Sequence, residues 1–158
     1  MNNTKDSFKN KWENNPDLVF SETLREGSDI FNWILTRNGF STPQQFDFFL
    51  SDKKRILDAG CGNGRVTALL RKYSNPQKTH IVAIDLVSNT VAKNNLREFQ
   101  NISFYCKDLL EDLKDIGTFD FIYCQEVLHH TSNPFKSFQN LVSLLDKDGE
   151  IAIYVYKK

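Results

Sequence analysis

The stretch of sequence that decides the fold is Ile56-Leu57-Asp58-Ala59-Gly60-Cys61-Gly62-Asn63-Gly64, an apolar run that leads into three alternating glycines. A strand, then glycines, then a helix is typical of nucleotide-binding sites, because glycines let the backbone approach a ligand closely. The dinucleotide pattern G-x-G-x-x-G is not met, since the third glycine comes one residue early and Arg65 follows it. Asp58 would repel a pyrophosphate, whereas a carboxylate at this point suits a cationic ligand. The stretch therefore favours a positively charged ligand over a dinucleotide.

Strand patterns alternate with helical patterns on both sides of this stretch. The predicted strands cover residues 55–58, 80–85, 102–106, 119–124 and 150–156. Helices are predicted after the glycines, from a cap at Ser88 to about Phe99, and from Asn133-Pro134 through Leu144 and Leu145. Alternation of this kind predicts an α/β fold, with a parallel sheet that carries helices on both faces.

Residues 1–52 differ from the rest of the chain, because they are rich in aromatic side chains and carry helix signals without strands. We expect the first 16 residues to be a loosely ordered N-terminal arm. Gly27 interrupts the apolar pattern that follows, so two short helices are predicted, with Asp29 capping the second and Gly39 ending it. Thr42-Pro43 then reads as a cap with proline at the first helical position.

Composition restricts the class of protein. The chain has 158 residues, of which 40% are hydrophobic and 25% charged, and its formal net charge is zero. This length fits one domain, and the charge balance argues against nucleic acid as the main partner. No stretch approaches the roughly 20 apolar residues of a membrane helix, and the polar N-terminus is unlike a signal peptide. We expect a cytoplasmic protein with no membrane span.

The cysteines Cys61, Cys106 and Cys124 fit neither a disulfide framework nor a zinc site, and the chain offers no other metal-ligand pattern. We interpret all three as buried thiols in a reducing compartment.

The glycine stretch resembles the first motif of class I S-adenosylmethionine-dependent methyltransferases, and the resemblance covers about residues 53–156. S-Adenosylmethionine carries an ammonium and a sulfonium group and no phosphate, which agrees with the charge of Asp58. The resemblance implies that the loop binds this cofactor through Asp58, Ala59, Gly60, Cys61, Gly62 and Gly64.

Acidic residues after the next two strands extend the resemblance. In the family, the acid that ends the second strand, here Asp85, accepts both ribose hydroxyls, and we include its neighbour Leu86. The acid after the third strand, here Asp108, accepts from the adenine amino group, and Leu109 packs on the ring. A helix-capping role for Asp85 is the alternative.

The segment after the fourth strand, Gln125-Glu126-Val127-Leu128-His129-His130, is similar to that of small-molecule methyltransferases of the ubiquinone and menaquinone biosynthesis type. The resemblance implies that Gln125 and Glu126 contact the methionine end of the cofactor. His129 and His130 are candidates for a general base, because histidine titrates near neutral pH. A capping or packing role for both histidines is the alternative.

The resemblance implies a three-layer Rossmann-like sheet of order 3-2-1-4-5, an N-terminal helical cap over residues 1–52 and a cofactor-binding domain over residues 53–158. Family members have seven strands, and we expect strands six and seven to be absent here, as in a shortened chain or a natural fragment. Residues 151–156 would then form an apolar edge, which a homodimer, another partner or the N-terminal helices could cover.

The predicted function is transfer of a methyl group from S-adenosylmethionine to a small-molecule acceptor, with S-adenosylhomocysteine as the product. A non-catalytic or partner-dependent cofactor-binding module is the first alternative. A dinucleotide-dependent oxidoreductase is the second, and the glycine spacing disfavours it.

Overall fold

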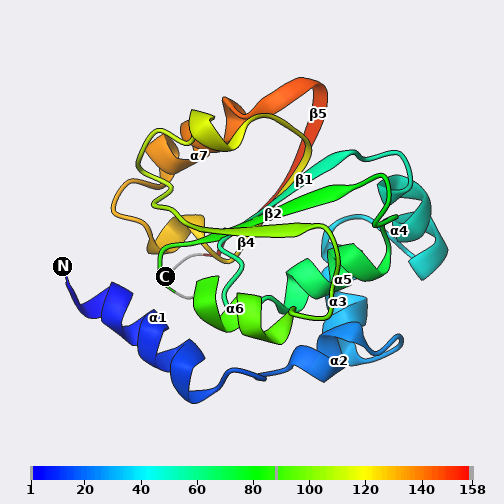
Figure 1. The fold of residues 1–158 in the computed structure, drawn as a ribbon, viewed down its shortest axis with the longest axis horizontal. Coiled ribbons are helices and arrows are strands. Elements are labelled where there is room, and N and C mark those ends of the chain that lie inside the picture. The colour runs from blue at the N-terminus through cyan, green and yellow to red at the C-terminus, as the bar shows by residue number, and fades with distance from the viewer. Residues whose placement is uncertain (1, 88, 157–158) are drawn as a thin grey trace.

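A parallel sheet forms the centre of the molecule (Figure 1). The computed structural model of the chain describes residues 2–87 and 89–156. Within them the strand order is β3-β2-β1-β4-β5, and every neighbouring pair is parallel. The predicted fold class and strand order are therefore confirmed. The strands are β1 (Arg55–Ala59), β2 (His80–Asp85), β3 (Ile102–Cys106), β4 (Phe119–Gln125) and β5 (Leu145–Tyr154).

Helices cover both faces of the sheet, because successive strand residues point to opposite sides. Ile56 on β1 packs with side chains of three helices, whereas the next residue, Leu57, packs in a separate cluster with η1 and α7 on the other face. Figure 1 shows α7 on the opposite side of the sheet from α3 and α5. The helices are α1 (Asn2–Asn14), α2 (Phe20–Leu24), α3 (Asp29–Arg37), α4 (Pro43–Leu50), α5 (Arg65–Lys72), α6 (Asn89–Asn95), α7 (Pro134–Val142), and the 3₁₀ turns η1 (Lys114–Ile116) and η2 (Leu128–His130).

Most of the predicted helix boundaries are confirmed, with one wrong cap. The two short helices on either side of Gly27, the Thr42 cap and the Asn133 cap are all present. Asp29 does not cap α3, because Ser28 Oγ accepts the hydrogen bond from Phe31 N–H at 3.1 Å. Asp29 is instead the first helical residue, where its charge favours the positive end of the helix.

The N-terminal arm differs from the prediction, since α1 extends over most of it. Phe8 and Trp12 stand four residues apart and so share one face of α1, and this face lies against the pocket described below. Tertiary packing therefore orders a helix whose own sequence is mostly polar.

Three further differences lie in the second part of the chain. Helix α6 ends at Asn95 rather than near Phe99, and the predicted cap at Ser88 lies outside the described residues. Leu145 was predicted to be helical, but it pairs with Phe119 at the beginning of β5. This strand begins before residue 150 because a register irregularity between Phe119 and Phe121 admits the extra residues.

The cysteine prediction is partly wrong. Cys61 and Cys124 are buried, but Cys106 is exposed, because it ends β3 at the edge of the sheet. Its thiol donates a hydrogen bond to the carbonyl oxygen of Leu86 at 3.2 Å. Over the described parts of the chain, no helix combines the length and apolar character that a membrane span requires.

Candidate functional site

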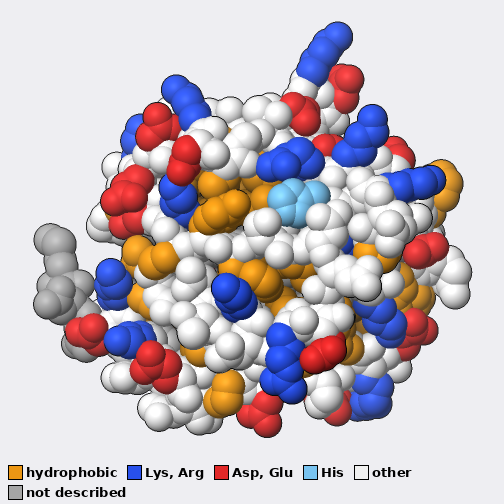
Figure 2. Space-filling view, viewed as in Figure 1, with side chains coloured by type: hydrophobic (Ala, Val, Ile, Leu, Met, Phe, Trp, Pro, Cys, Tyr) orange, Lys and Arg blue, Asp and Glu red, His pale blue; other side chains and the backbone are white. Residues whose placement is uncertain are grey.

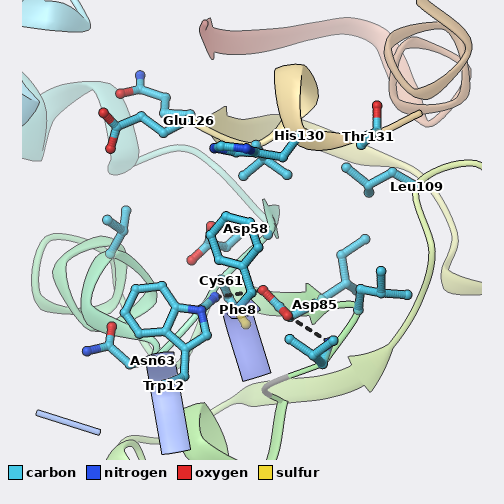
Figure 3. A pocket seen from close by; sticks show the side chains of 18 of the residues that line it. Phe8, Trp12, Asp58, Cys61, Asn63, Asp85, Leu109, Glu126, His130 and Thr131 are labelled. Carbon is cyan, nitrogen blue, oxygen red and sulfur yellow. Dashed lines mark hydrogen bonds between the residues drawn. The ribbon is translucent and has the colours of Figure 1, made fainter. Parts of the chain in front are cut away.

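A pocket of about 860 Å³ opens at the carboxyl ends of β1, β2 and β4, where ligands bind in open α/β sheets. Figure 3 shows Phe8 and Trp12 of α1 beside this pocket, with Asp58, Asp85 and His130 around them. The fold brings together most of the residues that the sequence indicated for a site. Those that line the pocket are Asp58, Gly60, Cys61, Gly62, Asp85, Leu86, Asp108, Leu109, Gln125, Glu126 and His130.

The glycine loop is tied to the neighbouring strand by its backbone. Gly60 and Cys61 N–H both donate to the carbonyl oxygen of Ile84, at 2.8 and 3.0 Å. Gly62 has φ of +55°, and a Cβ there would come within 2.8 Å of the Trp12 ring. The loop therefore requires glycine both for its backbone conformation and for the close approach of another group.

Asp58 is a buried carboxylate at the base of the pocket. Burial raises its pKa to about 6, and the nearby charge of Asp85 acts in the same direction. Thr67 donates a hydrogen bond to Asp58 Oδ2 at 2.5 Å, and this bond and the charge of Arg65 oppose the increase. The carboxylate is thus costly to ionise in the ligand-free protein, and a cation placed beside it would favour the ionised form.

Asp85 and Asp108 are each held by backbone groups at the end of a strand. Asp85 Oδ2 accepts from Gly62 N–H at 3.0 Å, and its Oδ1 accepts from Val87 N–H at 2.9 Å. Asp108 Oδ1 accepts from Leu110 N–H at 2.9 Å. These bonds fix two carboxylates along one wall of the pocket, where apolar side chains such as Leu86 accompany them.

Gln125 and Glu126 connect the end of β4 to helix α3. Glu126 has φ of +62°, a conformation that costs a non-glycine residue roughly 1–3 kcal/mol. Its Oε1 lies 3.5 Å from Nη1 of Arg37. The amide of Gln125 donates to Asn38 Oδ1, and its Oε1 accepts from the Tyr123 hydroxyl at 3.0 Å. This network holds the carboxylate of Glu126, a residue with a strained backbone, at the wall of the pocket.

The two histidines have different positions. His130 lines the pocket, and its ring meets Phe8 edge-on with 4.9 Å between the ring centroids. The Tyr156 hydroxyl lies 3.5 Å from His130 Nε2. The centroid of the His129 ring lies 4.1 Å from that of His130 and 4.0 Å from that of Tyr156. Of the two histidines, His130 is the one among the described residues that line the pocket.

Ala59, Gly64 and His129 are not among the described residues that line the pocket. Ala59 is buried in the core of the sheet. Gly64 lies against α6, because a Cβ there would come within 2.8 Å of Leu96 Cδ1. Ala59 and Gly64 thus pack against the fold, and their predicted contact with the cofactor stays a prediction.

From the sequence, the aromatic residues of the N-terminal region, Phe8 and Trp12 among them, fit either a roof over an acceptor or core packing, and core packing was favoured for most of them. The charged residues of the first helix were not predicted to contribute to the site. Lys5, Phe8, Lys11 and Trp12 all line the pocket. The spacing of Phe8 and Trp12 was a signal for one helical face, but nothing in the sequence says which surface that face covers. Arg65 was also missed, because we read it only as a departure from the dinucleotide pattern.

Comparisons with known proteins agree with this geometry. The profile of a family described as a methyltransferase domain matches residues 50–157. Ubiquinone biosynthesis O-methyltransferase of Coxiella burnetii is 32% identical over 101 residues, which cover 62% of this chain and 42% of that protein. Malonyl-[acyl-carrier protein] O-methyltransferase of Bacillus cereus is 33% identical over 96 residues, which cover 60% of this chain and 35% of that protein. The chain spans less than half the length of these two relatives.

Solved structures share the fold at low sequence identity. N-methyltransferase NodS from Bradyrhizobium japonicum WM9, in complex with S-adenosyl-L-homocysteine, superposes with a TM-score of 0.61 at 21% identity, over 94% of this chain and 71% of that chain. The CurJ carbon methyltransferase superposes with a TM-score of 0.66 at 18% identity, over 87% of this chain and 38% of that chain.

Proposed function

Because the chain belongs to the methyltransferase-domain family, the class I S-adenosylmethionine-dependent methyltransferases, we propose that it transfers a methyl group from S-adenosylmethionine to a small-molecule acceptor. The observation that carries this proposal is the buried Asp58 at the base of a glycine loop. Burial raises the pKa of the Asp58 carboxyl to about 6. In its ionised form this carboxylate attracts a cation such as the methionine ammonium and repels a pyrophosphate.

The residues of the pocket fit the cofactor in its other parts as well. We propose that Asp85 accepts hydrogen bonds from the ribose hydroxyls and Asp108 from the adenine amino group, and the position of both carboxylates in the pocket lining supports this. Leu86 and Leu109 provide apolar surface for the adenine ring. A dinucleotide would instead place its phosphates against Asp58.

The chain contributes mainly alignment to this reaction. The bound cofactor supplies an electrophilic methyl group on its sulfonium. Asp58 and the loop would hold the methionine end, and Asp85 would hold the ribose, all of which line the pocket. Positioning of this kind contributes roughly 7–11 kcal/mol to catalysis.

A small acceptor fits the size and lining of the pocket. Its volume of about 860 Å³ lies toward the upper end of the range of small-molecule sites, roughly 300–1,000 Å³. The aromatic side chains of Phe8, Trp33 and Tyr156 line it. The relatives named above are O-methyltransferases of ubiquinone biosynthesis and of malonyl-[acyl-carrier protein], which is compatible with a hydroxyl or carboxyl acceptor.

His130 is proposed as the general base for an acceptor that must lose a proton. It lines the pocket, whereas the ring of His129 packs against it, with 4.1 Å between the ring centroids. His130→Ala is expected to lower turnover roughly 10²–10⁴-fold with little change in cofactor affinity. The matched control is His129→Ala, which we expect to lower turnover less. Intact turnover in His130→Ala would leave both rings with packing roles only.

Calorimetry with S-adenosylmethionine, S-adenosylhomocysteine and NAD tests the cofactor. We expect both adenosyl ligands to bind and NAD not to bind, and binding of NAD alone would overturn the proposal. Release of S-adenosylhomocysteine with a panel of hydroxyl, carboxyl and amine acceptors tests catalysis. Cofactor binding without turnover on any acceptor would favour the non-catalytic module.

We also propose a cytoplasmic location, since all three cysteines are free thiols.

A further inference from the structure

Helix α1 brings positive charges to the pocket without bringing negative ones. The charged residues along this helix are Lys5, Asp6, Lys9, Lys11 and Glu13. Lys5 and Lys11 line the pocket, whereas the other three are not among the described residues that line it. Lys9 instead pairs with Glu13 at 3.9 Å. The face of α1 that is turned toward the pocket is therefore positively charged, although acids and bases are mixed along the helix as a whole.

The two lysines stand on either side of an aromatic side chain. Lys5 and Lys11 lie three residues before and three residues after Phe8, so all three share one face of the helix. The Phe8 ring points from α1 toward His130, with 4.9 Å between the ring centroids (Figure 3). Lys11 Nζ lies 6.0 Å from the centroid of the Phe8 ring and 4.5 Å from that of Trp12. A flat molecule placed against Phe8 and His130 would thus have an ammonium group near its edge.

The carboxylates of the pocket lining have other assignments. Asp58, Asp85 and Asp108 are proposed above to hold the cofactor. The Oε1 of Glu126 lies 3.5 Å from Nη1 of Arg37. Within the described parts of the chain, no carboxylate forms an ion pair with either lysine of the α1 face. The positive charge of this face is therefore not neutralised by the fold itself.

The other cations of the pocket lining are engaged. Lys107 pairs with Asp115. Arg65 donates from Nη1 to Thr23 Oγ1 at 3.1 Å, and its charge acts on Asp58. The lysines of the α1 face are both exposed, so an anion that enters the pocket can reach them.

We propose that the methyl acceptor is an aromatic acid, whose carboxylate is bound by Lys5 and Lys11 and whose ring lies against Phe8. This inference rests on the proposed function, because it names the substrate class of the same site. The bound carboxylate is not the methylated group, since its lone pairs are engaged by the ammonium groups. A ring hydroxyl oxygen instead forms the bond to the methyl carbon as the carbon–sulfur bond breaks. Sulfur keeps the electron pair, and His130 takes the hydroxyl proton.

Matched pairs of an acid and its amide test the proposal, because the amide keeps the shape of the ring and carries no charge. The probes are salicylate, gallate and caffeate, each compared with its primary amide on the chain saturated with S-adenosylhomocysteine. Calorimetry is expected to show at least one acid binding roughly tenfold more tightly than its amide. This preference should decrease as the salt concentration rises from about 0.02 M to about 0.5 M, since salt screens exposed charges.

Variants of the α1 face then assign the preference to its lysines. Lys5→Gln and Lys11→Gln are each expected to weaken binding of the acid roughly threefold, and the two together roughly tenfold. Binding of the amide and of S-adenosylhomocysteine should stay within twofold. Lys11→Arg keeps the charge and should keep the preference. The matched control is Lys9→Gln on the same helix, which should change none of these affinities.

Equal binding of acids and amides, or no binding by any member of the panel, would overturn the proposal. An equal loss of affinity for the acid and for S-adenosylhomocysteine in the lysine variants would also overturn it, because the lysines would then serve the cofactor. If the wild-type chain binds neither S-adenosylmethionine nor S-adenosylhomocysteine, the proposed function itself fails. If it binds them and prefers no acid to its amide, the inference alone fails.

Discussion

At the scale of single residues, Asp58 is subject to opposing requirements of folding and binding. Its carboxylate is buried, and its pKa is raised from 3.8 to about 6. Burial is the main cause, and the Thr67 hydroxyl reduces the effect. The negative charge of Asp58 costs free energy in the ligand-free fold, because it is buried. The same charge would select a cationic ligand.

The pH dependence of cofactor affinity follows from this pKa. Only the ionised Asp58 attracts the methionine ammonium, so affinity should be highest above pH 6 and decrease as the pH falls through 6. S-Adenosylmethionine is expected to bind roughly tenfold more weakly at pH 5 than at pH 7. Calorimetry across this range checks the prediction, and Asp58→Asn should show weak binding that varies little with pH. An affinity that is constant from pH 5 to pH 7 in the wild-type chain would contradict it.

The free energy of unfolding of the ligand-free protein should decrease as the pH rises, whereas cofactor affinity should increase. The folded protein keeps a proton on Asp58 up to about pH 6, whereas the unfolded chain loses it near pH 4. Asp58 therefore stabilises the ligand-free fold below pH 4, and this contribution is lost as the pH rises through 6. Asp58→Asn should raise the free energy of unfolding at pH 7.5 by up to about 3 kcal/mol. Urea unfolding at pH 7.5 and pH 4 measures this change in the free energy of unfolding. If Asp58→Asn is less stable than the wild-type chain at both pH values, the raised pKa of Asp58 is refuted.

At the scale of elements, the link between α1 and α2 is attached to the glycine loop. Asn63 Nδ2 donates to the carbonyl oxygens of Pro16 and Leu18, at 3.2 and 3.0 Å. Asn95 on α6 adds bonds to Pro16 and to the backbone of Asn63, at 2.7 and 2.9 Å. The position of α1 over the pocket therefore depends on the same loop that binds the cofactor.

Asn63→Ala should release this link. Its loss leaves the carbonyl oxygen of Leu18 without its side-chain donor and that of Pro16 with the bond from Asn95, which is expected to destabilise the fold by about 1–3 kcal/mol. Amide hydrogen exchange should become faster in α1 and in residues 16–20 while the central strands change little. The control is Asn15→Ala, since the exposed side chain of Asn15 donates to the carbonyl oxygen of Lys11, four residues earlier in the chain. Equal exchange rates in the two variants would show that Asn63 does not hold the helix.

At the scale of the whole molecule, charges of both signs are interspersed over the face drawn in Figure 2. This agrees with the zero net charge of the chain. Strand β5 lies at one edge of the sheet, and its apolar side chains from Ile151 to Tyr154 are half-buried. Trp33 covers Tyr154 with 6.2 Å between ring centroids, so the N-terminal helices shield part of one face of the strand. Its outer backbone edge is the part that can pair with another chain.

We expect the 158-residue chain to self-associate through β5 as its concentration rises. Val155 follows the strand and is 50% exposed, so Val155→Lys should reduce association by placing a charge beside the edge. Sedimentation velocity over a wide range of concentrations measures both chains. A wild-type chain that stays monomeric throughout would argue against pairing at this edge.

Local patterns in the sequence were enough to predict the strands, their parallel pairing and the glycine loop, because burial on both faces and the turn requirements of glycine leave short-range signals. The strand order came from the family resemblance, since no local pattern says which strands are neighbours. Asp85 and Asp108 were assigned to one site by the resemblance, and both line the pocket because parallel strands end at one edge of the sheet. Only the tertiary structure placed Phe8 and Trp12 over the pocket, exposed Cys106, and anchored Arg65 to Thr23 across 42 residues of sequence. The raised pKa of Asp58 also belongs to the fold, because it arises from the groups that surround the carboxylate and exclude water from it.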